Sequence, residues 1–217
     1  MKSRVRLSLL LPILAILTAC GPAAAAITPA TAPTPKGFDL SAWDVITVGT
    51  GSAATEANGG VNLFFAAKAQ GDPQQQAKIA VTLKSKCQMT GDFDLQVDYA
   101  LVNWPARNGV RFGLGADVNS VQRASNPHSA DNTYTTEFSG HIVSVETPDK
   151  SGRLRLTRVG TTVTGYYLSN RTWVQIDWAA ASTVSAGYAI EAWTDAYSFG
   201  GQDVRVNLKN LTATGCS

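Results

Sequence analysis

Apolar and polar residues alternate along most of the chain beyond residue 60. In the segment 92–99, DFDLQVDY, every odd position is apolar and every even position is polar. The same alternation recurs at 153–157 and at 204–209. A period of two is typical of a strand with one buried and one solvated face. These segments are therefore predicted strands, and further strands are expected at 61–67, 78–84, 110–114, 134–138, 163–167 and 188–193.

Helical periodicity is weak beyond the first twenty residues. No stretch of ten or more residues there repeats its apolar positions at the 3.6-residue spacing of a helix. The segment 158–162, RVGTT, predicts a hairpin turn in which Gly160 takes a positive φ. Many short strands separated by turn signals predict an all-β, antiparallel sandwich or barrel.

The first residues resemble a bacterial lipoprotein signal. Lys2, Arg4 and Arg6 precede an apolar run at 9–17, which ends in the sequence LTACG. The run has the length of a signal-peptide core and is short for a membrane span. In such a signal, Cys20 receives the lipid and becomes the mature N-terminus. The alternative is an ordinary secretory signal cleaved after one of the alanines at 23–26.

Three regions follow from this interpretation. Residues 1–19 are a predicted signal peptide, and residues 20–36 are the lipidated cysteine and a tether rich in Ala, Pro and Thr. Residues 37–217 are the predicted β-sandwich domain. The protein is expected in the bacterial cell envelope, held by lipid on the outer side of a membrane.

The charge balance excludes one class of partner. The chain has 18 Lys and Arg against 16 Asp and Glu, and the predicted signal peptide carries three of the basic residues. A nucleic-acid-binding domain needs a basic surface to neutralise phosphates, so no nucleic-acid partner is expected. The 44% of apolar residues argues equally against a disordered chain.

Three stretches resemble a known superfamily. They are GDFDLQVDYALVNWPARNGVRFGLGAD at 91–117, SGRLRLTRVGTTVTGYYLSNRTW at 151–173 and VRVNLKNL at 204–211. Together they are similar to bacterial members of the concanavalin A-like lectin/glucanase superfamily. The resemblance implies a jelly-roll β-sandwich of two antiparallel sheets, one of them curved, with a concave face that often binds glycans. That superfamily also includes laminin-G-like modules, so the resemblance implies a fold rather than any particular activity.

Cys87 and Cys216 remain once Cys20 is assigned to lipid. An even number of cysteines in an exported protein favours a disulfide. In a jelly roll of this type the first and last strands are commonly neighbours, so the resemblance implies that these two cysteines can pair. A functional thiol pair is the alternative.

The carboxylates argue against a hydrolase. Retaining glucanases of this superfamily carry Glu-x-Asp-x-(x)-Glu on one strand, and none of the four glutamates here has an Asp two residues on. Asp92, Asp94 and Asp98 are interpreted as the solvated face of a strand. A Gly-x-Ser-x-Gly elbow is also missing from the sequence. We therefore predict that the domain is not an enzyme.

Aromatic residues are the strongest candidates for ligand binding. Flat rings stack on sugars, and neighbouring polar groups take the hydroxyls. Trp193 shares a predicted strand face with Glu191, and Arg111 and Glu137 belong to other strands. These four residues are the predicted ligand-binding set, for a carbohydrate or another surface polymer. The alternative for any one tryptophan is core packing, which is expected of Trp43, Trp173 and Trp178.

Metal sites and other functions stay open. No cofactor is predicted, but calcium is possible where Asp117 and Asn119, or Asp131 and Asn132, flank a loop rich in Ser and Asn. The two histidines, at 128 and 141, are interpreted as surface residues. An adhesive, protein-binding domain of the envelope is the alternative to carbohydrate binding, and a glycoside hydrolase is the third possibility.

Overall fold

The protein is all-β. The structure, a computed structural model, describes residues 38–216. Within that range there is no α-helix, and the only helical turns are two 3-10 turns, η1 (Leu40–Ala42) and η2 (Pro73–Gln75). The strands are β1 (Trp43–Val48), β2 (Thr50–Ala57), β3 (Gly60–Gln70), β4 (Lys78–Asn103), β5 (Arg111–Ala116), β6 (Asn119–Ser125), β7 (Asn132–Phe138), β8 (His141–Glu146), β9 (Ser151–Val159), β10 (Thr162–Ser169), β11 (Thr172–Ala180), β12 (Ala186–Asp195) and β13 (Val204–Cys216).

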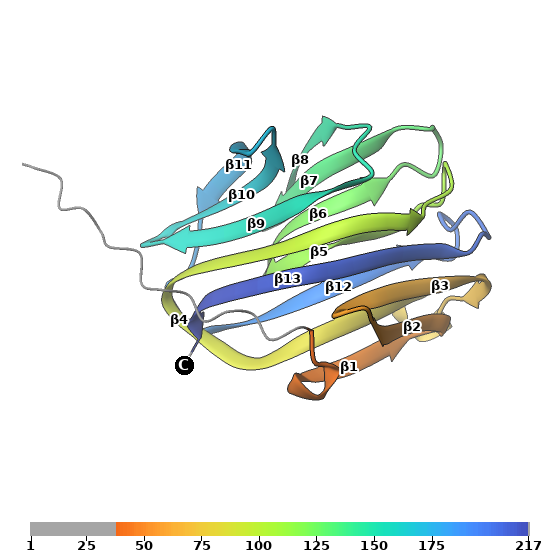
Figure 1. Ribbon diagram of the computed structural model, residues 1–217, viewed down its shortest axis with the longest axis horizontal. Coiled ribbons are helices and arrows are strands. Elements are labelled where there is room, and N and C mark those ends of the chain that lie inside the picture. Colours follow the sequence, from red (N-terminus) through yellow and green to blue (C-terminus); the bar gives the residue numbers. More distant parts are fainter. Residues whose placement is uncertain (1–37, 217) are drawn as a thin grey trace, which may run out of the picture. The chain divides into compact units, whose positions relative to one another are not determined.

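Strand β4 links two layers of antiparallel strands (Figure 1). Its first half pairs with β1 and β12, and its second half pairs with β9 and β13. Gly91 lies where the strand passes from one layer to the other, and its φ of 67° is one that glycine adopts without strain. We call β1-β4-β12-β5-β6-β7-β8 the groove sheet and β2-β3-β13-β4-β9-β10-β11 the back sheet.

The core lies between these sheets. Along β4, the apolar positions 93, 95, 97 and 99 are all buried, and the polar positions between them are not, so the predicted alternation is confirmed. Leu154 and Leu156 of β9 belong to the same buried cluster as Leu114 of β5 and Val121 of β6, and β9 contacts both of those strands. Burial of these apolar side chains is the main force that holds the layers together.

A buried arginine crosses the core at one end. Arg123 of β6 is 1% exposed, and its guanidinium donates to the backbone carbonyls of Ala124, Thr133, Thr147 and Asp149. These bonds satisfy most of the donors of a charge that would otherwise be costly to bury. Periodicity predicts no such residue, because its side chain points inward at a position that usually holds an apolar one.

A tyrosine pair lies beside this arginine. The hydroxyls of Tyr99 and Tyr134 are 2.7 Å apart, and the Tyr134 hydroxyl donates to Asp149 Oδ2 at 2.9 Å. Burial raises the pKa of both tyrosines, and the hydrogen bond to Asp149 raises that of Tyr134 further. Both hydroxyls therefore stay protonated and tie β4 to β7.

Cys87 and Cys216 form the predicted disulfide. Their Cα atoms are 5.6 Å apart, and the bridge joins residues 129 positions apart in the chain. The bridge links the end of β13 to β4, next to the position where Cys216 and Met89 are paired in the sheet. The predicted hairpin is confirmed too, since Gly160 has a φ of 56° between β9 and β10.

Two tryptophans expected in the core lie outside it. Trp43 packs there as predicted, against Phe38 and Tyr188. Trp173 is half-buried on the outer face of the back sheet, and Trp178 is 61% exposed. The structure also adds strands that the alternation did not predict: β1, β2, β6, β8 and β11.

The predictions for residues 1–36, including lipidation of Cys20, lie outside the described residues. From residue 38 to residue 216, no helix has the length and hydropathy needed to cross a bilayer.

Candidate functional site

A groove runs across the outer face of the groove sheet. Its volume is about 550 Å³, within the usual range for a small-molecule site. It crosses β4, β12, β5, β6 and β7, whose outward side chains fall into rows because neighbouring strands are in register. One such row joins Thr82, Glu191, Gly113 and Gln122.

Small residues form the floor of this groove. Gly113 and Gly115 of β5 lie beside Gly187 and Ala189 of β12. A Cβ on Gly113 would be 2.0 Å from the carbonyl oxygen of Val121, whereas one on Gly115 would meet nothing closer than 3.7 Å. The first glycine is therefore required by the close approach of the neighbouring strand, and the second leaves open space for a ligand.

Trp193 forms one wall of the groove with two cations. The Arg111 guanidinium lies 4.8 Å from the centre of its ring and the Lys78 ammonium 5.7 Å. Both distances are within the range of cation–π attraction. Lys78 also donates to Glu191 Oε1 at 2.7 Å, as does the Thr82 hydroxyl at 3.2 Å. The ring and the carboxylate are thus held side by side.

Gln122 is one of two buried amide side chains in the site. It is 8% exposed, and its Nε2 donates to the Ser120 hydroxyl at 2.7 Å. Its Oε1 is buried without a hydrogen-bond partner, as is the Oδ1 of Asn119, which also lines the groove. A buried amide without a full set of partners costs free energy, so a ligand hydroxyl that completes the set would be bound favourably.

The charges of the groove are balanced. Lys78 and Lys84 line it together with Asp117, Glu137 and Glu191. Within residues 38–216, Lys78 is ion-paired to Glu191, while Lys84 and Glu137 have no ion pair. A site with both signs of charge has no strong bias toward an anionic or a cationic ligand.

The end of β12 is held by an ionised carboxylate. Asp195 Oδ1 accepts from the backbone N–H groups of Tyr197 and Ser198, at 3.0 and 2.9 Å. Partial burial raises the pKa of Asp195, but the hydrogen bonds from Ser198 and Tyr197 outweigh it and hold the pKa below its ordinary value. The turn that follows Trp193 is therefore most stable when Asp195 is charged.

The four predicted ligand-binding residues share one face. Glu137, Glu191 and Trp193 line the groove, and Arg111 lies directly against Trp193. Sequence reasoning missed Gln122 and Lys78. It also missed the glycines of β5, although the sequence Gly113-Leu114-Gly115 inside a predicted strand is a signal of close backbone approach.

The candidate calcium ligands are not brought together. Asp117 precedes β6 and Asp131 follows it, so they lie at opposite ends of that strand. Between residues 38 and 216, no cluster of three or more His, Cys, Asp or Glu side chains could hold a metal. Carbonyl oxygens also bind calcium, so the calcium hypothesis is not tested by these side chains.

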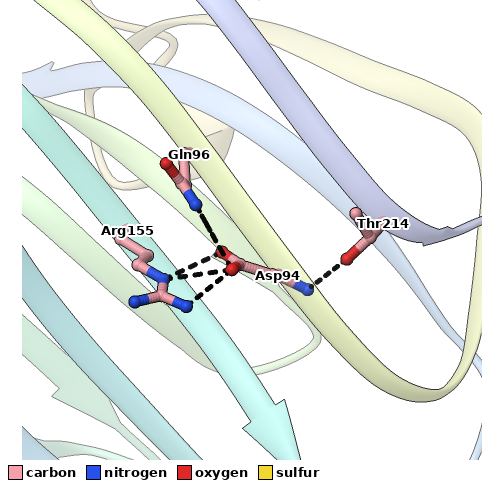
Figure 2. Close-up of polar contacts among 4 residues, drawn as sticks. All are labelled: Asp94, Gln96, Arg155 and Thr214. Atoms are coloured by element: carbon pink, nitrogen blue, oxygen red, sulfur yellow. Dashed lines mark hydrogen bonds and ion pairs between the residues drawn. The ribbon is translucent and has the colours of Figure 1, made fainter. Parts of the chain in front are cut away.

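The acidic cluster of β4 is far from the groove, on the back sheet. Asp94 accepts three hydrogen bonds from Arg155, from Nε to the two carboxylate oxygens at 3.0 and 3.2 Å and from Nη2 at 2.6 Å (Figure 2). Gln96 also donates to this carboxylate, and Asp98 is ion-paired to Arg153. These carboxylates form the partly exposed polar face of a strand, as interpreted from the sequence.

Comparison with solved structures shows a shared fold. An alginate lyase from Klebsiella pneumoniae superposes with a TM-score of 0.58 and 12% identity, over 85% of this chain and 98% of the lyase. The PL7 alginate lyase AlyA1 from Zobellia galactanivorans gives 0.54 and 11%, over 83% and 97%. A legume lectin-like domain from Entamoeba histolytica gives 0.56 and 9%, over 82% and 92%. The predicted jelly-roll β-sandwich fold is thereby confirmed.

No protein-family model and no curated protein sequence matches the chain.

The prediction that this domain is not an enzyme is wrong. Alginate lyases are enzymes, and they have the same fold at about the same length. The prediction considered only glycoside hydrolysis, which uses a pair of carboxylates. A lyase breaks its bond by elimination, which needs a base that removes a proton and no such pair. The missing hydrolase motifs therefore do not decide whether this chain is catalytic.

Proposed function

We propose that the groove binds a carbohydrate chain. The observation that carries this proposal is the wall formed by Trp193, Arg111, Lys78 and Glu191 beside the partner-less Oε1 of Gln122. A sugar has apolar C–H faces and polar edges, so it needs both a ring to stack on and groups that bond its hydroxyls. The groove offers an aromatic ring and hydrogen-bonding groups on neighbouring strands of one sheet.

Each wall residue has a distinct part in this binding. The indole of Trp193 packs against the sugar face, and its orientation is stabilised by the two cations beside it. Glu191 accepts from sugar hydroxyls through the oxygen that Lys78 and Thr82 leave free, since both donate to Oε1. Because these contacts exist before the ligand arrives, little side-chain entropy is lost on binding.

The small residues on the floor of the groove determine how closely a bound polymer can lie to the sheet. With glycine and alanine on β5 and β12, a polymer can approach the backbone closely. The lectin-like and alginate lyase structures with this fold support a saccharide ligand. The predicted anchor at Cys20 and the tether at 20–36 would present the groove outside the membrane, where such polymers are abundant.

Binding by the purified full-length protein tests this proposal. A glycan array selects a saccharide, and titration calorimetry then compares the wild type with the Trp193→Ala variant. We expect at least a tenfold loss of affinity in Trp193→Ala. Its melting temperature should change by only a few degrees, since the half-buried ring lies outside the core. Tyr197→Ala is the matched control, because that ring is 89% exposed and lies outside the groove.

Three results would count against the groove. They are no bound saccharide on the array, unchanged affinity in Trp193→Ala, and an equal loss in Tyr197→Ala. Capture of envelope proteins in a pull-down with no array signal would favour the alternative of an adhesive domain. Each bound saccharide is also incubated with the protein and its products are separated by chromatography, which measures turnover directly.

A further inference from the structure

A second group of aromatic side chains lies on the opposite face of the domain. We call Tyr166, Trp173, Gln175 and Trp178, together with Arg155, the back-sheet patch. Tyr166 is paired with Arg155 on one side and Gln175 on the other, and Trp173 and Trp178 lie along the same strand, β11. None of these residues lines the groove.

A β-bulge brings the two tryptophans to one face. Trp173 and Trp178 are five positions apart, and in a regular strand an odd spacing puts side chains on opposite faces. The register between β10 and β11 shifts at Gly165 and Tyr166, which adds one residue to β11 and restores Trp178 to the outer side. Without that bulge, Trp178 would point into the core.

The polar groups between the rings are fixed. The Arg155 guanidinium lies 5.5 Å from the ring centre of Tyr166 and 5.3 Å from that of Trp173. Asp94 holds that guanidinium through three hydrogen bonds (Figure 2). Such paired donors and acceptors do not have to be ordered when a ligand binds.

Charge and polarity indicate what this patch can bind. Asp94 is paired with Arg155 and Asp98 with Arg153, so the surface around the rings is close to neutral. An apolar protein partner or a lipid surface would bury these ion pairs at a cost. An uncharged sugar chain can place its C–H faces on the rings and leave the ion pairs hydrated.

We propose that the back-sheet patch is a second carbohydrate-binding surface, for an uncharged polysaccharide. It does not rest on the function proposed for the groove, because the two sites lie on opposite sheets. With both sites occupied, one domain would hold two chains at once.

Sedimentation with insoluble polysaccharides tests the patch. The full-length protein is mixed with microcrystalline cellulose, chitin or curdlan, and the unbound fraction is measured. We expect Trp178→Ala to reduce retention at least tenfold and Trp178→Phe to restore much of it. Tyr197→Ala is the matched control and should be retained like the wild type, because that exposed ring belongs to neither the groove nor the patch. Trp193→Ala is measured beside it to detect binding by the groove. Trp178 is 61% exposed, so its removal should leave the melting temperature unchanged.

The outcomes separate the two sites. The proposal would be refuted if Trp178→Ala were retained on every polysaccharide that retains the wild type. It would also be refuted if none of the polysaccharides retained the wild type. Loss of retention in Trp193→Ala alone would assign that binding to the groove and refute the patch. Binding to phosphatidylcholine vesicles that Trp178→Ala abolishes, without any polysaccharide binding, would identify a lipid surface and also refute it.

Discussion

The disulfide between Cys87 and Cys216 makes the sharpest stability prediction. It closes a loop between residues 129 positions apart, which includes most of the described chain. Loop-closure entropy for a ring of about 130 residues corresponds to about 5 kcal/mol at 25 °C, and natural disulfides commonly supply about 2–4 kcal/mol. At about 2–4 °C per kcal/mol for a domain of this size, the double variant Cys87→Ala/Cys216→Ala should melt roughly 5–20 °C lower.

The fold of that variant should persist. The ends of β4 and β13 remain paired by backbone hydrogen bonds at Met89 and along residues 94–103. The main change is therefore in the unfolded chain, which expands when the bridge is lost. Expansion exposes more surface on unfolding, so the urea m-value should increase while the midpoint falls.

Urea unfolding followed by tryptophan fluorescence measures both quantities. Dithiothreitol should destabilise the wild type to the level of the double variant, and it should leave the double variant unaffected. Near-ultraviolet circular dichroism in the absence of urea checks that the folded state is the same. A loss of less than about 1 kcal/mol would refute the entropic argument, as would a wild type that is insensitive to dithiothreitol.

Four further substitutions follow from individual contacts. Gly113→Ala should lower the free energy of unfolding by roughly 2–4 kcal/mol through its clash with the neighbouring strand, whereas Gly115→Ala should change stability little and weaken saccharide binding. Arg158→Met should lower the free energy of unfolding in chemical denaturation, because this buried guanidinium donates to the carbonyls of residues 91, 182 and 184, and a buried carbonyl left without a donor costs about 1–3 kcal/mol. Asp195→Ala should destabilise the protein slightly at pH 7. The folded-state pKa of Asp195 is lowered, so its contribution is present above the ordinary pKa near 4 and disappears as the pH falls through the folded value. The difference in melting temperature between the wild type and Asp195→Ala should therefore shrink as the pH is lowered below 4, and a constant difference would contradict the assignment.

The alternation of apolar and polar residues was enough to predict the fold class. The inward positions of 92–99 and 204–209 are those that the alternation marks as apolar, because a strand exposes its two faces at a fixed period. Several strands escaped this reasoning. β6 reads Asn119-Ser-Val-Gln-Arg-Ala-Ser125, and its buried polar residues hide the pattern. β8 and β11 lie at sheet edges, where burial is incomplete and the alternation is weak.

The chemistry of the groove could be predicted only in part. Trp193 and Glu191 share a face because they are two residues apart on one strand, which the sequence shows directly. Gln122 is different, since nothing local marks an amide whose oxygen is buried without a partner. Its burial depends on β5 and β7, which flank it in the sheet.

The sequence by itself determined the all-β class and the apolar positions of the predicted strands, which are β3, β4, β5, β7, β9, β10, β12 and β13. These properties follow from local period and composition, which each segment carries with it. Only the tertiary structure decided which outward face became a groove and why Trp178 lies outside the core. The bend of β4 at Gly91 and the bulge in β11 set both results. Each depends on pairing between strands distant in sequence, and a single inserted residue reverses which side of a strand faces the core.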